Sequence, residues 1–289
     1  MCYIDTELPD VSEGSEQIVE FQVNTEWHGS QSAPRVASRP DGHFLVVWHD
    51  PDDLQAPPQL SGQLFGDDGT KLGQQVQAVP ASGVALFDSE LTALTDGSFV
   101  LVWSVLVEVS LPGGSGPDWE IRARSFGGDG VPIGAPFAIN DYDAGPQLDP
   151  HIAALPDGRF VVVWTSCEGF YETNPAGPDG DGCGIYGRLF LGDGTPEGPE
   201  FAVNTGFEDD QDTPVVAALV DNGFVAFWRS DPTDGLDHGI VGQFFNLDGS
   251  KSGQELTANK HKPALHLFPS VAAESGQMLI SWNSCPPSY

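Results

Sequence analysis

The octapeptide Asp157-Gly-Arg-Phe-Val-Val-Val-Trp164 decides the fold, because the chain of 289 residues carries five copies of it. An apolar, β-branched run after an Asp-Gly pair is typical of a strand that follows a tight hairpin turn. The tryptophans that end the copies lie 54 to 64 residues apart. The other copies are Asp41–Trp48, Asp96–Trp103, Asp221–Trp228 and the more divergent Ser275–Trp282.

Three further short segments recur in each unit. Gln-x-x-Pro-x-Val-Ala precedes the Asp-Gly turn, as in Gln147–Ala153, and Gly-Ile-x-Gly-Gln/Arg-x-Phe-x-x-Asp-Gly follows the tryptophan, as in Gly184–Gly194. Phe-x-Val-Asn-Thr ends the unit, as in Phe201–Thr205. Each segment is rich in β-branched or aromatic residues and bounded by turn residues, which indicates a strand. Four antiparallel strands per unit, repeated radially, describe the blade of a propeller.

The sequence therefore predicts an all-β protein: a five-bladed β-propeller of four-stranded antiparallel blades, forming a single domain over residues 1–289. The second strand of each blade is expected to be buried against both neighbouring blades, because it is apolar on both faces. Its tryptophan should then pack between blades. The repeats span approximately residues 21–80, 81–140, 141–204, 205–259, and 260–289 completed by 1–20.

The two ends of the chain are expected to share one blade. The fifth unit stops after its second strand, at Trp282, whereas Phe21–Thr25 matches a fourth strand and Tyr3–Leu8 is a weaker match to a third strand. Terminal strands that complete one blade would remove the exposed edges of an open ring.

The four cysteines fit this arrangement. The repeat places Cys167 and Cys183 at the ends of neighbouring strands in one blade, and Cys285 and Cys2 at similar positions in the shared blade. Two disulfides, Cys167–Cys183 and Cys2–Cys285, are therefore predicted, with four buried free thiols as the alternative. Disulfides form in oxidising compartments, so an extracellular or cell-surface location is expected, although no signal peptide is recognisable at Met1.

Charge excludes two classes of partner. The chain has 42 acidic and 11 basic residues, for a net charge of −31. Such a surface repels the phosphates of nucleic acids and the anionic lipids of membranes. The longest apolar run, Phe99–Val107, is too short to span a bilayer. We expect neither nucleic-acid binding nor membrane insertion, and we expect a monomer.

The longer, variable loops of such a propeller lie opposite the tight Asp-Gly turns, and loops of this kind usually carry function. Pro178-Asp-Gly-Asp-Gly182 resembles the start of a calcium loop, although the complete twelve-residue pattern is absent. Calcium is therefore the one cofactor that the sequence suggests, and solvated acidic loops are the alternative. The candidate metal ligands are Asp179, Asp181, Asp209 and Asp210.

The blade connections also carry aromatic residues next to amides. A flat apolar ring beside hydrogen-bonding groups is what carbohydrate recognition requires. The alternative is that these rings only cover the seams between blades. The candidate ligand-binding residues are Trp27, Tyr142, Phe207, Asn24, Asn140 and Asn204.

Catalysis has a weaker signal. The first strands, which face the central channel of a propeller, carry or adjoin Arg35, Glu90, Asp149, His151 and Asp212. These residues supply enough carboxylates for an acid–base pair. The chain has no nucleophile elbow, no His-Glu metal motif and no phosphate-binding loop.

The repeat resembles one found in large secreted bacterial surface proteins, and the resemblance covers essentially the whole chain. It implies export and a binding or structural role. In blade number the chain is also similar to tachylectin-type lectins, which have several sugar sites, but no binding residue carries over. The main hypothesis is thus an exported module that recognises carbohydrate or a cell-surface ligand on the long-loop face, assisted by calcium. The alternatives are a polysaccharide-acting enzyme with channel carboxylates, and a structural module of a surface assembly.

Overall fold

A computed structural model describes most of the chain. The described residues form strands, turns and loops, and none of them forms a helix that could cross a membrane. The structure describes residues 21–25, 30–50, 58–81, 84–111, 114–142, 145–167, 182–206, 210–220, 223–231, 239–259 and 265–285.

The strands form four four-stranded antiparallel sheets and one two-stranded hairpin, so the prediction of an all-β fold is confirmed. The first sheet contains β1 (Ser32–Ser38), β2 (Phe44–His49), β3 (Leu60–Phe65) and β4 (Lys71–Val79), and the second contains β5 (Leu86–Ala93), β6 (Phe99–Leu111), β7 (Gly114–Phe126) and β8 (Pro132–Ala138). The third contains β9 (Gln147–Ala154), β10 (Phe160–Cys167), β11 (Cys183–Phe190) and β12 (Phe201–Ala202), and the fourth contains β13 (Asp210–Leu219), β14 (Gly223–Asp231), β15 (Gly239–Phe245) and β16 (Lys251–Thr257). The hairpin is β17 (Leu265–Glu274) and β18 (Gln277–Cys285).

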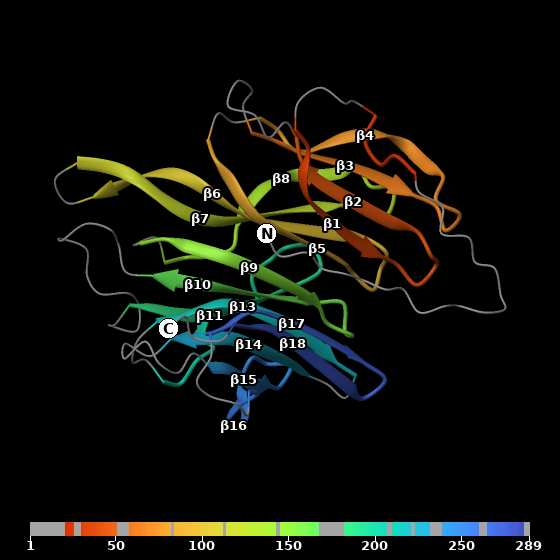
Figure 1. Ribbon diagram of the computed structural model, residues 1–289. Helices are drawn as coiled ribbons and strands as arrows, with labels where there is room; N and C mark the ends of the chain where they lie inside the picture. Colours follow the sequence, from red (N-terminus) through yellow and green to blue (C-terminus); the bar gives the residue numbers. More distant parts are fainter. Residues whose placement is uncertain are drawn as a thin grey trace.

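The sheets follow one another in chain order, from β1–β4 at the top of Figure 1 to β13–β18 at the bottom, an order consistent with a β-propeller. The first strand of each sheet contacts the first strand of the next: β1 meets β5, β5 meets β9, β9 meets β13, and β13 meets β17. These five first strands are therefore the inner strands.

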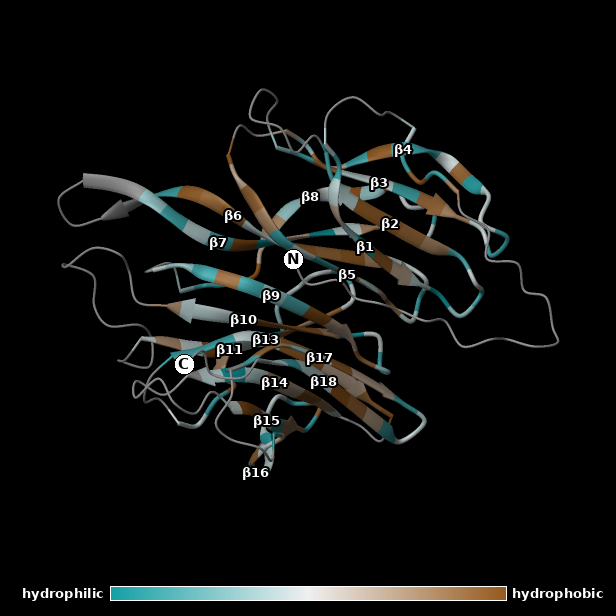
Figure 2. Cartoon of the chain, in the orientation of Figure 1, coloured by the Kyte–Doolittle hydropathy of each residue, from teal (hydrophilic) through white to brown (hydrophobic). Residues whose placement is uncertain are grey.

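Apolar side chains from facing sheets fill the seams between them. Trp103, Trp164 and Trp228 are almost completely buried, each in a different seam, which confirms their predicted role in packing. Figure 2 shows the apolar residues concentrated along second strands such as β2. Within the third sheet, the rings of Phe160 and Phe190 stack 5.1 Å apart.

Every inner strand has the same irregularity, opposite the tryptophan of the second strand. Two residues of the inner strand face one residue of its partner, which is a β-bulge. The first bulge residue has a φ between 46° and 53°, a left-handed conformation that costs roughly 1–2 kcal/mol for a residue with a side chain. The five residues are Ala33, Asp88, Asp149, Thr213 and Phe268.

One predicted disulfide is confirmed. Cys167 ends β10 and pairs with Cys183 at the start of β11, and their sulfur atoms are bonded. The other predicted pair, Cys2–Cys285, includes a residue outside the described part of the chain and stays a prediction.

The fifth blade is shown only in part. The hairpin β17–β18 supplies two strands, whereas Tyr3–Leu8, the expected third strand, lies outside the described residues. The expected fourth strand, residues 21–25, is described but is not assigned as a strand.

Residues 21–25 nevertheless contact the first sheet as residues 201–205 contact the fourth. The ring of Phe21 lies 5.3 Å from that of Phe65, and Phe201 lies 5.7 Å from Phe245. The ammonium group of Lys71 donates to the backbone carbonyl of Asn24 (3.2 Å), as that of Lys251 donates to Asn204 (2.7 Å). The segment thus occupies the place that a fourth strand holds in another seam.

Small residues on the third strands make close packing possible. A Cβ atom added to Gly242 would lie 2.4 Å from ring atoms of the fully buried Phe227. Gly242→Ala should therefore lower the free energy of unfolding by about 1–3 kcal/mol, measured by denaturant titration. The control is Gly206→Ala, where an added Cβ has open space and the change should stay within about 0.5 kcal/mol. Equal effects of the two substitutions would contradict this packing.

Candidate active site

A cleft of about 180 Å³ opens where the inner strands meet. It receives bulge residues from four of the five inner strands and the residues that follow them, so the repeated bulge builds its wall. Its lining includes Arg35, Asp88, Ser89, Glu90, Asp149, Pro150, His151, Thr213, Pro214, Val215, Phe268 and Pro269.

Asp149 has the most strongly perturbed carboxyl group in the cleft. Burial, together with the nearby charges of Asp88 and Asp212, raises the pKa of Asp149 from its ordinary value near 3.8 to about 6. The hydroxyl of Thr165 donates to Asp149 Oδ2 (3.3 Å) and in turn accepts the backbone N–H of Thr213 (3.2 Å). The carboxyl group is thereby held in place and carries a proton in mildly acidic solution.

Asp88 supplies a second carboxylate from the neighbouring inner strand. It occupies the equivalent bulge position of β5. Burial raises the pKa of Asp88, and the positive charges of Arg35 and His49 offset part of that increase. Among the described residues it has no hydrogen-bond partner and no ion pair, so its oxygen atoms are available to a ligand.

Two other carboxylates of the channel are held by arginines. The guanidinium of Arg35 donates to Glu90 Oε2 (3.0 Å), which joins β1 to β5 across the first seam. Arg229 Nε donates to Asp212 Oδ1 (2.7 Å), and its Nη2 donates to the other oxygen. Such two-point contacts fix the orientation of a carboxylate.

His151 is a neutral donor in this setting. Burial lowers the pKa of His151. Its Nδ1 atom accepts the backbone N–H of Val216 (3.3 Å), so the proton of the neutral ring lies on Nε2. The ring thus links the third sheet to the fourth and presents an N–H donor from its other edge.

Phe268 adds an apolar surface to the cleft. It stands at the bulge of β17, in a left-handed backbone conformation that is unusual for a bulky residue. Its side chain is 65% exposed. An exposed ring beside carboxylates and an imidazole can stack on the apolar face of a sugar.

Sequence reasoning found part of this site. Arg35, Glu90, Asp149 and His151 were named for the channel alternative and all four line the cleft, while Asp212 lies just outside its lining and acts on the charge of Asp149. Asp88 was not predicted, and Phe268 was not among the candidate ligand-binding residues. Both stand where the repeat places the residue before proline, and aligning that position across the units would have singled them out.

The amides predicted to bind ligand are engaged within the fold. Asn140 Oδ1 accepts the backbone N–H of Ile121 (2.8 Å), and Asn204 Oδ1 accepts that of Ile185 (2.9 Å). Asn140 also donates to the backbone carbonyl of the half-buried Tyr142. Asn24 donates to the side-chain oxygen of Gln31 (3.2 Å). These contacts join consecutive strands, and a role of these residues in ligand binding stays a prediction.

The predicted calcium site falls mostly outside the description. Asp179, Asp181 and Asp209 lie outside the described residues, as do the aromatic candidates Trp27 and Phe207. Asp210 is described, and its carboxylate accepts the backbone N–H of Cys183 (3.0 Å). No group of three or more His, Cys, Asp or Glu side chains suited to a metal ion occurs in the part of the chain that the structure describes. Calcium binding at the predicted loops is untested.

No protein-family model and no curated protein matches the sequence. Solved structures match the fold. An α-L-arabinofuranosidase from Fusarium graminearum, complexed with arabinobiose, has a TM-score of 0.55 at 12% identity, covering 86% of this chain and 73% of that one. An α-L-arabinanase from Penicillium chrysogenum, also complexed with arabinobiose, has a TM-score of 0.54 at 15% identity over 89% and 81%. A protein of unknown function from Dyadobacter fermentans has a TM-score of 0.57 at 13% identity over 86% and 74%.

These matches support the β-propeller fold and correct the main functional prediction. The main hypothesis, a module whose role is to recognise carbohydrate or a cell-surface ligand, is contradicted, because two of these neighbours are an arabinofuranosidase and an arabinanase. They fit the alternative better, a polysaccharide-acting enzyme with carboxylates in the channel. The likeness to a surface-protein repeat and to tachylectin-type lectins finds no support in them.

The raised pKa of Asp149 has a consequence for stability. Ionisation of Asp149 is less favourable in the native state than in the unfolded state. The free energy of unfolding therefore falls as pH rises from about 4 through about 6. Asp149→Asn should therefore stabilise the protein by ~1–2 kcal/mol more at pH 8 than at pH 4, after allowance for solvent screening, in denaturant titrations.

Asp248→Asn is a control of opposite sign. Hydrogen bonds from Ser250 lower the pKa of the exposed Asp248, so this replacement should reduce stability at pH 8 relative to pH 4. The same pH trend in both variants would rule out the electrostatic account of Asp149.

Proposed function

We propose that the protein is a glycoside hydrolase that cleaves a neutral polysaccharide in the channel cleft. The proposal rests on two carboxyl groups that line the same cleft. Asp149 is held in place and has a pKa of about 6, and Asp88 has no hydrogen-bond or ion-pair partner among the described residues. Two carboxyl groups with separate roles are the usual requirement for hydrolysis of a glycosidic bond.

The environments assign the roles. Protonated Asp149 is the general acid that donates its proton to the leaving-group oxygen as the bond between that oxygen and the anomeric carbon breaks. Asp88 is the base that takes a proton from the attacking water, whose oxygen bonds to the anomeric carbon. Asp212 and Glu90 are less suited to this step. Arg229 contacts both oxygen atoms of Asp212, and the oxygen atoms of Glu90 accept from Arg35 and from the backbone N–H of Leu91.

The cleft favours a neutral sugar. Its carboxylates repel uronic acids and sulfated sugars, whereas the hydroxyl groups of a neutral sugar can donate to them. Phe268 offers a ring for stacking, and His151 offers a neutral N–H donor. Because two structural neighbours bind arabinobiose, arabinan is the first substrate to test.

The same proposal includes a closed ring that works outside the cytoplasm. Val36 of β1 is 62% exposed and Leu279 of β18 is 72% exposed, so the first and last sheets each leave an apolar side chain that a completed fifth blade would cover. Residues 21–25 already lie in the place of a fourth strand. Strands from residues 1–20 would complete the fifth blade, and the disulfide in the third sheet fits an oxidising compartment.

Activity tests the catalytic roles. Purified protein should release reducing ends from arabinan or from another neutral polysaccharide in a panel with xylan and galactan. Its kcat/KM should fall as pH rises above about 6, because Asp149 must be protonated. Asp149→Asn and Asp88→Asn should each lower kcat about 10²–10⁴-fold, whereas Asp248→Asn, on an outer turn, should keep full activity. Full activity in either channel variant, or no hydrolysis of any polymer, would overturn the proposal.

Disulfide mapping tests the closed ring. Digestion without reductant should yield a peptide pair that joins Cys2 to Cys285, beside the pair that joins Cys167 to Cys183. The first link closes a very long loop, so Cys2→Ser should lower the free energy of unfolding by about 3–5 kcal/mol. Free thiols at both Cys2 and Cys285 in protein purified under oxidising conditions would speak against the shared blade.

A further inference from the structure

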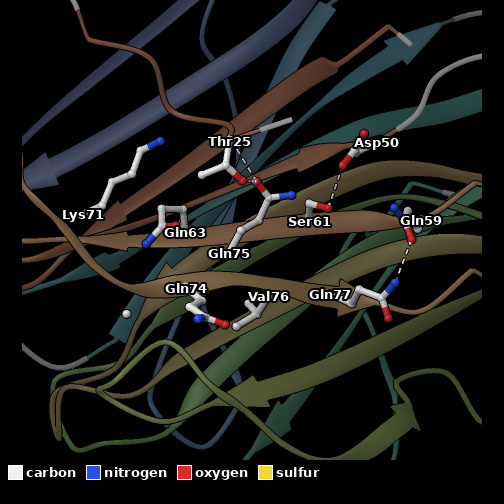
Figure 3. A pocket seen from close by; sticks show the side chains of 11 residues that line it. Thr25, Asp50, Gln59, Ser61, Gln63, Lys71, Gln74, Gln75, Val76 and Gln77 are labelled. Atoms are coloured by element: carbon white, nitrogen blue, oxygen red, sulfur yellow. Dashed lines mark hydrogen bonds between the residues drawn. The ribbon is translucent and has the colours of Figure 1, made fainter. Parts of the chain in front are cut away.

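A second cleft lies on the first sheet, away from the channel. It has a volume of about 470 Å³, more than twice that of the channel cleft, and its wall is formed mainly by β3 and β4 (Figure 3). Since β1 is the inner strand of this sheet, the cleft lies on the outer half of the blade. Its lining residues are Thr25, Asp50, Gln59, Ser61, Gln63, Lys71, Gly73, Gln74, Gln75, Val76 and Gln77.

The lining is polar but carries almost no net charge. Five glutamine side chains face this space, and the two charged side chains, Asp50 and Lys71, have opposite signs. The whole chain, in contrast, has a net charge of −31. Primary amides both donate and accept hydrogen bonds, so the cleft matches a ligand of neutral hydroxyl groups better than a cation or an anion.

Hydrogen bonds within the wall hold several of these side chains in place. The side-chain oxygen of Gln75 accepts the backbone N–H (3.1 Å) and the hydroxyl (2.8 Å) of Thr25. Gln77 Nε2 donates to Gln59 Oε1 (3.2 Å), as Figure 3 shows. These hydrogen bonds to the side-chain oxygens of Gln75 and Gln59 fix the orientation of both amide groups. A ligand therefore meets N–H₂ donors that are already oriented.

A buried acceptor at the base of the wall lacks a partner. Gln63 is 1% exposed, and its Nε2 donates to the backbone carbonyls of Leu64 (3.0 Å) and Leu72 (2.9 Å). Its Oε1 has no hydrogen-bond partner among the described residues. A buried acceptor left without a partner is costly. This oxygen is itself shielded from solvent, so a ligand in the cleft meets the more exposed amides of Gln59, Gln75 and Gln77.

Comparison with the other sheets shows what is particular to the first. The backbone N–H of Thr205 donates to Glu255 in the fourth sheet, and that of Asp141 donates to Glu200 in the third, just as Thr25 donates to Gln75 in the first. The contact needs only an acceptor oxygen, which glutamate and glutamine supply equally. The glutamine in the first sheet replaces a negative charge with an N–H₂ donor.

We propose that this cleft is a binding site for a neutral oligosaccharide, separate from the channel and without catalytic activity. The glutamine amides and Ser61 hydrogen-bond the sugar hydroxyls. The proposal does not require the channel to be catalytic. If both proposals hold, a polysaccharide bound at the two sites gains avidity.

Calorimetry and NMR on a channel-inactive background test the site. In Asp149→Asn protein, arabino-, xylo- and galacto-oligosaccharides are titrated one at a time, and side-chain amide signals of glutamine are followed. At least one oligosaccharide should bind and shift the signals of Gln59, Gln75 and Gln77. Each oligosaccharide is tested up to about 10 mM, so that weak binding is detected. If none of them shifts these signals, the proposal is overturned.

Two variants and one matched control locate the binding. Gln59→Ala combined with Gln77→Ala removes exposed or half-buried amides, and binding should weaken about tenfold. Gln75→Glu restores the acceptor of the other sheets, keeps the contact with Thr25, and should weaken binding similarly. Thr257→Ala, at the position of the fourth sheet that matches Gln77, should leave binding unchanged.

The outcomes separate this proposal from the catalytic one. Undiminished binding in both cleft variants overturns the accessory site, whatever the channel does. Hydrolysis by the wild type, measured separately, decides the channel proposal. Binding that is lost in the cleft variants supports the accessory site even where no polysaccharide is hydrolysed.

Discussion

The position of each buried tryptophan, opposite a two-residue bulge of the inner strand, is the constraint on which the rest of the structure depends. Trp164 of β10 is buried in the seam between the second and third sheets and faces the bulge that contains Asp149 and Pro150. The tryptophan is too large to shift within a close-packed seam. The bulge beside it is therefore fixed, and every blade repeats the relation.

This arrangement lets a repeated backbone build an asymmetric site. The five bulges have nearly the same left-handed φ, but their side chains differ: Ala33, Asp88, Asp149, Thr213 and Phe268. Backbone strain of this kind persists only where the surroundings enforce it, and it clusters at functional sites. Neighbouring blades contribute the acidic pair, and the hairpin β17–β18 contributes the aromatic ring. A single site in a five-fold scaffold thus needs no change of fold, only different residues at one repeated position.

The sequence was sufficient for the strands because their signals are local. The apolar run before Trp164 and the Asp-Gly turn before it specify a buried strand and its hairpin without reference to other blades. The disulfide between Cys167 and Cys183 followed from the same register. The site was harder to predict, because no local pattern shows which way a bulge turns its side chain. Asp88 precedes Ser89 where the other units have proline, so its equivalence to Asp149 emerges only when the units are aligned. Perturbation of the Asp149 carboxyl also depends on Asp212, which belongs to another sheet.

The few cations of the chain explain why one carboxyl group differs from its neighbours. The chain has 11 basic residues against 42 acidic ones, and two of its arginines are paired with Glu90 and Asp212 in the channel. Neither arginine is paired with Asp149, so burial and the charges of Asp88 and Asp212 act on that group with little compensation. The contrast between fixed, paired carboxylates and one protonated acid is how neighbouring groups acquire separate chemical roles. The same scarcity of cations bears on ligand choice, because a strongly acidic surface repels anionic polymers but admits neutral ones. Both clefts suit a neutral ligand. The carboxylates of the channel can accept hydrogen bonds from sugar hydroxyls, and the amides of the first sheet can both donate and accept them.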